Sequence, residues 1–230
     1  MSLSEEAVVA EYRRLARDSK ERFDVLRHVP QLGQQHWRYY FSSAFDSFTA
    51  LWKLVKRHRA LLIEQCDLQR MDVGDVASRI GQLYFHFYLR TSRMQYLKQS
   101  MTFFDALRSR QYYLSQNDMD AAVLGGKQFR FLARYIVVAI LLQLPKNFIL
   151  SLIRELTEAG KGGPAVAQEA TNFLQVIVGP YEEWSQAPLR YQAASLRPRE
   201  QQGIRLRHAL LVSSVSDQVC NCQVYQGCHS

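Results

Sequence analysis

The segment from Asp72 to Tyr113 constrains the fold more than any other part of this chain. In its first half, apolar residues recur at helical spacing, at Val73, Val76, Ala77, Ile80, Leu83, Tyr84 and Phe87. The second half repeats the pattern after a polar turn, at Tyr96, Leu97, Met101, Phe104 and Leu107. Gly81 and Ser100 lie on or beside these stripes, where a small side chain lets a neighbouring helix approach closely. The segment therefore predicts a helical hairpin.

Two more helices are predicted upstream of this hairpin. The first extends from about Ser4 to His28, because Ser4 and the following glutamates suit a helix start and Pro30 stops the pattern. The second extends from about Gln35 to Glu64, with a bend around Arg57 to Ala60. Both carry a single apolar stripe that predicts packing against other helices.

Downstream of the hairpin we predict an exposed loop from Ser115 to Gly126, with one helical turn at Met119–Leu124. Lys127–Leu144 is apolar on nearly all sides and predicts a buried helix. A further helix begins near Pro145 and ends at Gly160, and another begins at Pro164. The alternation of helices and short turns predicts a second hairpin.

Together these patterns predict an all-α fold, a right-handed stack of antiparallel helical hairpins that forms a degenerate, tetratricopeptide-like α-solenoid. Residues 1–179 are expected to form the helical-repeat scaffold domain. Residues 180–230 show no sustained periodicity and are expected to form an irregular, partly disordered tail.

Composition excludes several classes of protein. The first residues lack the basic and apolar regions of a signal peptide, so secretion is not expected. The longest apolar run, Tyr135 to Leu142, is far shorter than the roughly 20 residues of a membrane span. The cysteines form no disulfide framework, because Cys66 stands alone and the other three crowd the carboxyl end. A net charge of +8 favours an acidic partner without identifying one.

The densest basic stretch is a candidate contact patch made of Lys53, Lys56, Arg57 and Arg59. Such a patch can contact phosphates, and a neighbouring aromatic ring such as Trp52 can then stack on a base. Trp52 falls on the apolar stripe, however, and is expected in the core. A solvated helix face is the simpler interpretation of these four charges.

A second candidate is the cluster of soft ligands at the carboxyl end, Cys220, Cys222, Cys228 and His229. Zinc accepts three cysteines and one histidine, but the usual two-residue spacing of the first cysteine pair is absent. An incidental tail is the alternative interpretation, and we predict no metal or other cofactor.

No set of residues predicts catalysis. His86 lacks a nearby nucleophile or carboxylate and is expected to be structural. Gly125-Gly126-Lys127 lacks the spacing and preceding strand of a phosphate loop. Tyr112 and Tyr113 fit either a protein interface or a cap on the hairpin core. We therefore predict a protein that is not an enzyme.

Four long segments carry a resemblance to a known family. They are HVPQLGQQHWRYYFSSAFDSFTALWKLVKRHR at residues 28–59, VASRIGQLYFHFYLRTS at 76–92, YLKQSMTFFDALRSRQYY at 96–113 and FRFLARYIVVAILLQL at 129–144. Together they resemble the amino-terminal region of the SCAI family, suppressor of cancer cell invasion. Members of that family continue well past this length, so we expect a fragment, a splice form or a mis-predicted end. The resemblance implies a truncated relative of plant or algal type.

The resemblance implies a nuclear transcriptional cofactor, typically a corepressor. In that family the partners are transcription-factor complexes of the myocardin-related and serum-response-factor type, and double-strand-break repair factors have also been linked to it. A transcription factor or coactivator is thus the expected partner, and the nucleus, with the cytoplasm second, the expected location. The alternative is a basic helical-repeat module that binds nucleic acid, which the charged patch would favour.

Overall fold

The computed structural model describes residues 4–29, 36–113, 121–160, 168 and 172–173. These ranges contain seven α-helices and no strand, which confirms the all-α prediction. The chain divides into two compact units, Met1–Tyr112 (unit 1) and Tyr113–Ser230 (unit 2).

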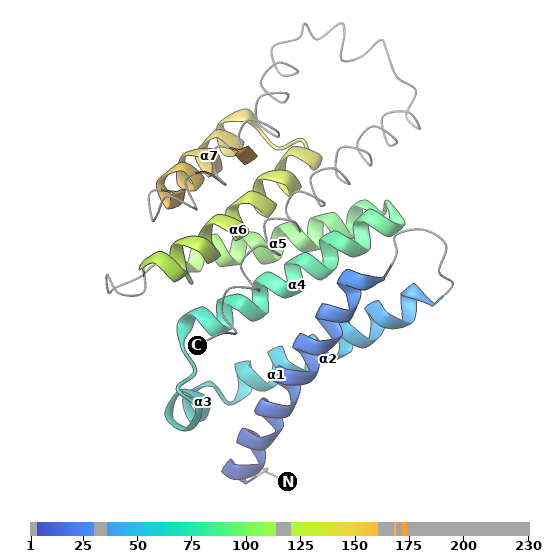
Figure 1. The fold of residues 1–230 in the computed structure, drawn as a ribbon, viewed down its shortest axis with the longest axis vertical. Helices are drawn as coiled ribbons and strands as arrows, with labels where there is room; N and C mark the ends of the chain where they lie inside the picture. The colour runs from blue at the N-terminus through green and yellow to red at the C-terminus, as the bar shows by residue number, and fades with distance from the viewer. Residues whose placement is uncertain (1–3, 30–35, 114–120, 161–167, 169–171, 174–230) are drawn as a thin grey trace, which may run out of the picture. The chain divides into compact units, whose positions relative to one another are not determined.

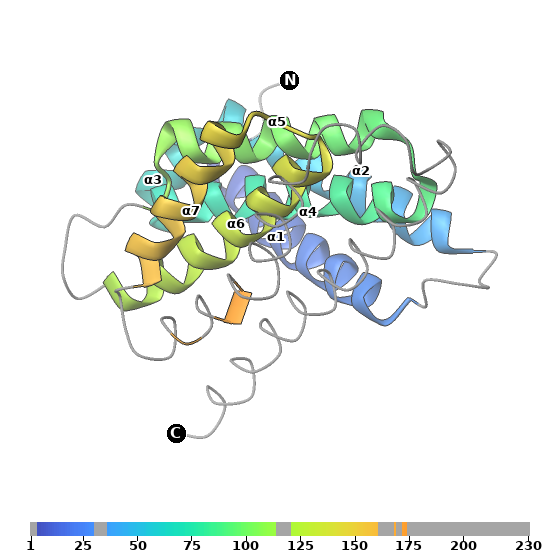
Figure 2. The ribbon, with the colours of Figure 1, turned by 90° about the horizontal axis from the view of Figure 1, so that it is seen from above.

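Unit 1 contains five of the helices (Figure 1). They are α1 (Glu5–His28), α2 (Trp37–Arg57), α3 (Arg59–Cys66), α4 (Arg70–Thr91) and α5 (Met94–Arg110). Helix α1 packs on α2, α4 packs on α5, and α2 joins the two pairs by packing on α4. Figure 2 shows α4 and α5 side by side from a second direction. The pairs confirm the predicted architecture of packed helical hairpins.

The boundaries of the first two helices follow local chemistry. The Ser4 side chain accepts a hydrogen bond from the Ala7 amide at 3.3 Å and so caps the amino end of α1. The predicted bend in the second helix is a complete break, because His58 adopts a non-helical conformation (φ −116°, ψ 30°) between α2 and α3. Both the start of the first helix and the location of the bend are therefore confirmed.

The core of unit 1 lies between α1, α2 and α4. Its buried members are Phe23, Leu26, Phe41, Ala44, Phe48, Ile80 and Leu83. The rings of Phe23 and Phe48 meet edge to face at 6.1 Å between centroids. Nearby, the buried hydroxyls of Ser19 and Ser47 lie 2.8 Å apart and satisfy each other between α1 and α2.

The α4–α5 hairpin closes through a close helix crossing at Gly81. A β-carbon added to Gly81 would lie 2.7 Å from a ring carbon of Phe104 and 3.3 Å from Cβ of Phe103. Glycine is therefore required for this approach, as its place on the apolar stripe predicts. Ser100 is also fully buried in the hairpin. Ser92 ends α4 in the left-handed conformation (φ 54°) and turns the chain into α5.

Unit 2 contains the packed pair α6 (Ala121–Leu141) and α7 (Lys146–Gly160). Gln143 reverses the chain between them in the left-handed conformation (φ 56°). The ring of Tyr135 stacks on Phe131 at 5.7 Å and meets Phe148 edge to face at 5.9 Å. The predicted second helical hairpin and its buried helix are confirmed.

One prediction in unit 2 is wrong. Gly125 and Gly126 are buried residues of α6, not part of an exposed loop, and the helix begins six residues earlier than predicted. Each glycine costs a helix about 1 kcal/mol relative to alanine. Ala121, Ala122 and Leu124 are strong helix formers, and burial of Leu124 adds packing energy, so the helix continues through the glycines.

Several predictions fall outside the described residues. Among them are the loop at 115–120, most of the helix expected from Pro164 and the whole tail with its candidate zinc ligands Cys220, Cys222, Cys228 and His229. The division into residues 1–179 and 180–230 stays a prediction. Within the described ranges, none of the helices is both long enough and apolar enough to span a membrane.

Candidate functional site

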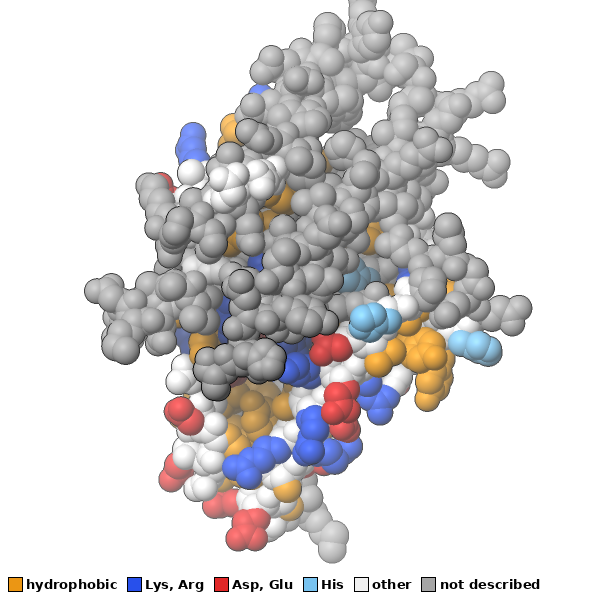
Figure 3. All heavy atoms as spheres, viewed as in Figure 1, with side chains coloured by type: hydrophobic (Ala, Val, Ile, Leu, Met, Phe, Trp, Pro, Cys, Tyr) orange, Lys and Arg blue, Asp and Glu red, His pale blue; other side chains and the backbone are white. Residues whose placement is uncertain are grey.

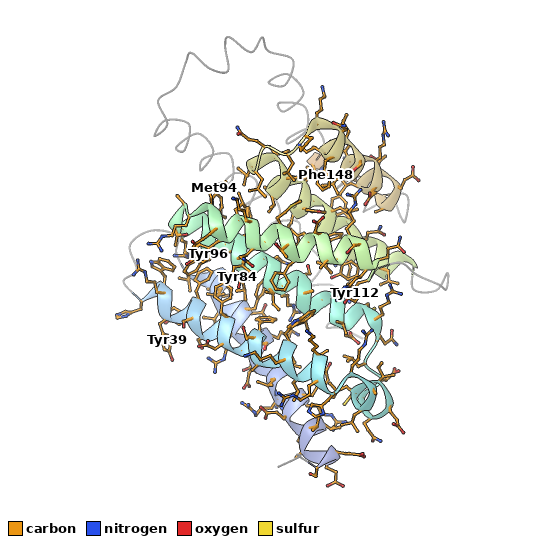
Figure 4. The ribbon with its side chains drawn as sticks, turned by 180° about the vertical axis from the view of Figure 1, so that it is seen from behind. Tyr39, Tyr84, Met94, Tyr96, Tyr112 and Phe148 are labelled. Atoms are coloured by element: carbon orange, nitrogen blue, oxygen red, sulfur yellow. The ribbon has the colours of Figure 1, made fainter. Side chains whose placement is uncertain are left out.

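Seven aromatic side chains of unit 1 form a continuous strip that crosses three helices and is only partly buried. This aromatic strip comprises Trp37, Phe45 and Trp52 of α2, Tyr84 and Phe87 of α4, and Tyr96 and Phe103 of α5. Figure 4 shows Tyr84 and Tyr96 between α2 and α5, with Tyr39 on the outer side of α2. Partly exposed aromatic residues at this density are typical of protein-binding surfaces.

Ring-to-ring contacts join the strip without interruption. At its centre Phe45 lies 4.8 Å from Tyr84, and Tyr84 stacks on Phe103 at 5.8 Å. Phe87 meets Tyr96 edge to face at 4.5 Å. At the start of α2, the ring centroid of Trp37 lies 5.5 Å from that of Phe87 in α4. Near the end of α2, the ring centroid of Trp52 lies 6.4 Å from that of Phe103 in α5. Because each ring is held by others, the strip is rigid before any partner arrives.

Two guanidinium groups mark the Trp37 end of the strip. The Arg38 guanidinium lies 5.5 Å from the centroid of Trp37, and that of Arg90 lies 5.4 Å from it. Arg90 also donates a hydrogen bond to the Val29 carbonyl at 2.8 Å, which ties α4 to the end of α1. Burial lowers the pKa of Arg90, although the group stays charged at neutral pH. Arg90 is thus a structural clamp, whereas Arg38 is exposed.

Tyr84 lies at the centre of the strip, where its ring is half-buried. Burial, and secondarily the neighbouring Tyr96, raises the pKa of the Tyr84 hydroxyl. The Tyr84 hydroxyl therefore remains a neutral donor and acceptor at physiological pH. A tyrosine of the strip can therefore pack its ring against an apolar side chain of a partner and form a hydrogen bond to that partner through its hydroxyl.

The predicted basic patch also lies in unit 1. Lys53, Lys56 and Arg57 belong to the last turns of α2 and Arg59 opens α3, and all four side chains are exposed. Among the described residues, none of these four forms an ion pair. Trp52 packs against the core and Phe103, as predicted, so its ring is not free to stack on a base.

The remaining candidates lie apart from the strip. Tyr112 is buried and its hydroxyl accepts a hydrogen bond from Arg110 at 3.1 Å, which favours the capping interpretation for this residue. Tyr113 is buried in unit 2, where its ring lies 6.1 Å from that of Phe131. His86 is half-buried beside Phe85, and Gly125-Gly126-Lys127 lies in α6. Within the described ranges no group of three or more His, Cys, Asp or Glu could hold a metal ion.

Comparison with known families decides where this chain belongs. The family model for Protein SCAI matches residues 14–186, which contain the entire aromatic strip and the basic patch. The chain belongs to the SCAI family. The mouse and human SCAI proteins are each 41% identical to it over 154 residues, which is 67% of this chain and 25% of theirs. A Dictyostelium discoideum SCAI homologue is 38% identical over 179 residues, 74% of this chain and 23% of that protein.

The chain thus spans about a quarter of the length of these SCAI relatives. No solved structure matches it. The family membership confirms the resemblance inferred from the four segments.

The aromatic strip was not predicted from the sequence, because its rings were assigned to the core. A signal was available in α2. On a helical wheel, Phe41, Phe48 and Val55 mark the core side, and Phe45 and Trp52 lie about 50° to one side of them. The apolar arc of α2 is wider than the roughly 100° that one packing face requires. The additional part of this arc holds Phe45 and Trp52, which belong to the aromatic strip.

Proposed function

We propose that this SCAI-family chain is a non-enzymatic protein-binding scaffold. It acts in the nucleus as a transcriptional cofactor of the corepressor kind. Its partners are transcription factors or their coactivators. The nuclear location and the regulatory role rest on the family, and the binding role rests on the surface of unit 1.

The single observation that carries the proposal is the aromatic strip. It combines partly buried rings from three helices with tyrosine hydroxyls and lies inside the residues that match the family. Tyrosine and tryptophan are the residues that most often dominate the binding energy of protein interfaces. Its rings hold each other in place, so a partner would not have to order them.

The mechanism is non-covalent. A segment of a transcription factor lies across α2, α4 and α5, covers the strip and excludes water from it. Occupation of that segment prevents the factor from binding another coactivator, and transcription falls. Binding needs no metal, cofactor or proton transfer.

Affinity capture from nuclear extract tests this function. The tagged chain is compared with Tyr96→Ala, which removes a strip ring, and with Ile63→Ala, which removes an exposed apolar side chain of α3. We expect the parent and Ile63→Ala to retrieve the same transcriptional or chromatin proteins, and Tyr96→Ala to lose them. Failure of the folded parent chain to retrieve any such protein above a tag-only control rejects the cofactor function.

A second candidate, nucleic-acid binding, is supported by the four exposed cations of the basic patch. If all four contacted phosphates, log K for duplex DNA would fall with log salt at a slope of about −3.6. Fluorescence anisotropy with DNA and RNA between low and physiological salt separates this candidate from the scaffold. An absence of binding at low salt removes it.

A further inference from the structure

One edge of α2 carries a regular line of residues along the aromatic strip. Successive steps of four, three, four, three and four residues connect Arg38, Ser42, Phe45, Thr49, Trp52 and Lys56. Steps of this kind place side chains on one side of a helix. Arg38 and Lys56 therefore end the same line, eighteen positions and about five turns, or about 27 Å, apart. Both side chains are exposed.

The facing edge of α5 repeats the arrangement in the same direction. Trp37 contacts Phe87, which contacts Tyr96 at the start of α5, whereas Trp52 contacts Phe103, about two turns further along α5. Helices α2 and α5 therefore run parallel on either side of the strip. Arg110 follows Phe103 by seven residues, which places it on the strip side of α5 at the end that Lys56 marks on α2.

The strip is thus bounded by positive charge at both ends, by Arg38 and Arg90 at one and by Lys56 and Arg110 at the other. Helices α2 and α5 place no carboxylate on these two lines. Asp46, the one carboxylate of α2, lies about 80° round the helix from the edge line, and Asp105, the one carboxylate of α5, lies about 150° from the line that joins Phe103 to Arg110.

The opposite side of α2 differs in charge. Helix α1 packs there, through the Ser19–Ser47 contact, and Figure 3 shows basic and acidic side chains interleaved on that side. Arg14 of α1 pairs with Glu11 at 2.7 Å and with Asp18 at 3.0 Å. The α1 side of α2 therefore carries charges of both signs, whereas Arg38 and Lys56 on the edge line form no ion pair with any described residue.

We propose that the aromatic strip binds an amphipathic helix of a partner protein that carries carboxylates at both of its ends, about five turns apart. This inference rests on the proposed scaffold function and names the chemistry of the partner. Apolar residues of the helix at i, i+3, i+4 and i+7 cover the strip rings. Its terminal carboxylates lie at the two cationic ends and fix its register, because opposite charges across an interface set orientation more than affinity.

A charge-swap experiment tests the proposal. The probe is a peptide of about 20 residues, with blocked ends, leucine and phenylalanine at helical spacing and glutamates at both ends. A second peptide has lysines in place of those glutamates. Each is titrated by fluorescence anisotropy into the parent chain, into Arg38→Glu/Lys56→Glu, and into Lys20→Glu/Lys98→Glu.

The last variant is the matched control. It makes the same change in net charge at two exposed lysines, one on α1 and one about 150° round α5 from the Tyr96 to Phe103 edge. Circular dichroism verifies that every variant stays helical and melts within a few degrees of the parent.

We expect the acidic-ended peptide to bind the parent and the control equally, and Arg38→Glu/Lys56→Glu to bind it at least about tenfold more weakly. The lysine-ended peptide should bind the parent weakly and should bind Arg38→Glu/Lys56→Glu more tightly than it binds the parent. Equal binding of both peptides to the parent, equal weakening in the control, or the absence of that tighter binding overturns the proposal. The proposal is also overturned if the parent chain binds duplex DNA or RNA and Arg38→Glu/Lys56→Glu abolishes that binding, because the two cations would then contact phosphates.

Failure of this inference can be told apart from failure of the proposed function. If nuclear capture retrieves transcriptional proteins but neither peptide binds, the scaffold stands and the chemistry assigned to its partner is wrong. If nuclear capture retrieves none, the scaffold function itself fails.

Discussion

Replacing Gly81 by alanine should destabilise unit 1, although alanine is the better helix former. Alanine gains about 1 kcal/mol over glycine in a helix interior. The added β-carbon, however, lies 2.7 Å from a ring carbon of Phe104, a fully buried side chain, and 3.3 Å from Cβ of Phe103. Overpacking of this kind costs about 1–3 kcal/mol. We expect a net loss of about 1 kcal/mol, which lowers the melting temperature by about 2–4 °C.

The matched control is Gly126→Ala in α6. Its added β-carbon would meet nothing closer than Arg130 Nη1 at 3.7 Å, an ordinary contact, so only the helix gain of about 1 kcal/mol should remain. Thermal unfolding followed by circular dichroism should therefore move in opposite directions for the two variants. Adding Phe104→Leu to Gly81→Ala should recover part of the loss, with a coupling of at least about 0.5 kcal/mol. A Gly81→Ala protein as stable as Gly126→Ala would refute the close-crossing argument.

Three further changes test other parts of unit 1 by the same measurement. Ser4→Ala removes the cap on α1 and should cost about 1 kcal/mol, whereas Ser4→Asp should restore it. Arg90→Met removes both the hydrogen bond to the Val29 carbonyl and the contact with Trp37, and should cost about 2 kcal/mol; no loss would show that Arg90 is not a clamp. Ser100→Ala should be neutral or stabilising by up to about 1 kcal/mol, because the buried hydroxyl has no hydrogen-bond partner in the part of the chain that the structure describes; a clear loss of stability would contradict this.

Where local chemistry fixes an element, the sequence predicts it closely. Ser4 is followed by two glutamates and a periodic stripe, and α1 begins and ends within a residue of its prediction. The Gly81 crossing is likewise predictable, because a glycine on an apolar stripe has few uses other than close approach.

Tertiary context overrides local signals at other positions. Gly125 and Gly126 look like loop residues, yet both lie in α6, because the packing of a buried helix outweighs their weak propensity. The aromatic strip escaped prediction for a different reason. Periodicity shows that Phe45 and Trp52 are apolar neighbours of the core, but only the arrangement of α2, α4 and α5 shows that these rings stay partly exposed and join Tyr84 and Tyr96.

The most direct test of the central claim, that the strip is where a protein partner binds, is site-specific photo-crosslinking in nuclei. Tyr96 is replaced by the photoreactive residue p-benzoylphenylalanine, and in a matched chain Lys98 of the same helix is replaced instead, since it is exposed on another side of α5. We predict that light joins the first chain, and not the second, to a transcriptional or chromatin protein. Crosslinks of equal yield from positions 96 and 98, or no crosslink from position 96, would contradict the claim that a protein partner binds at the strip.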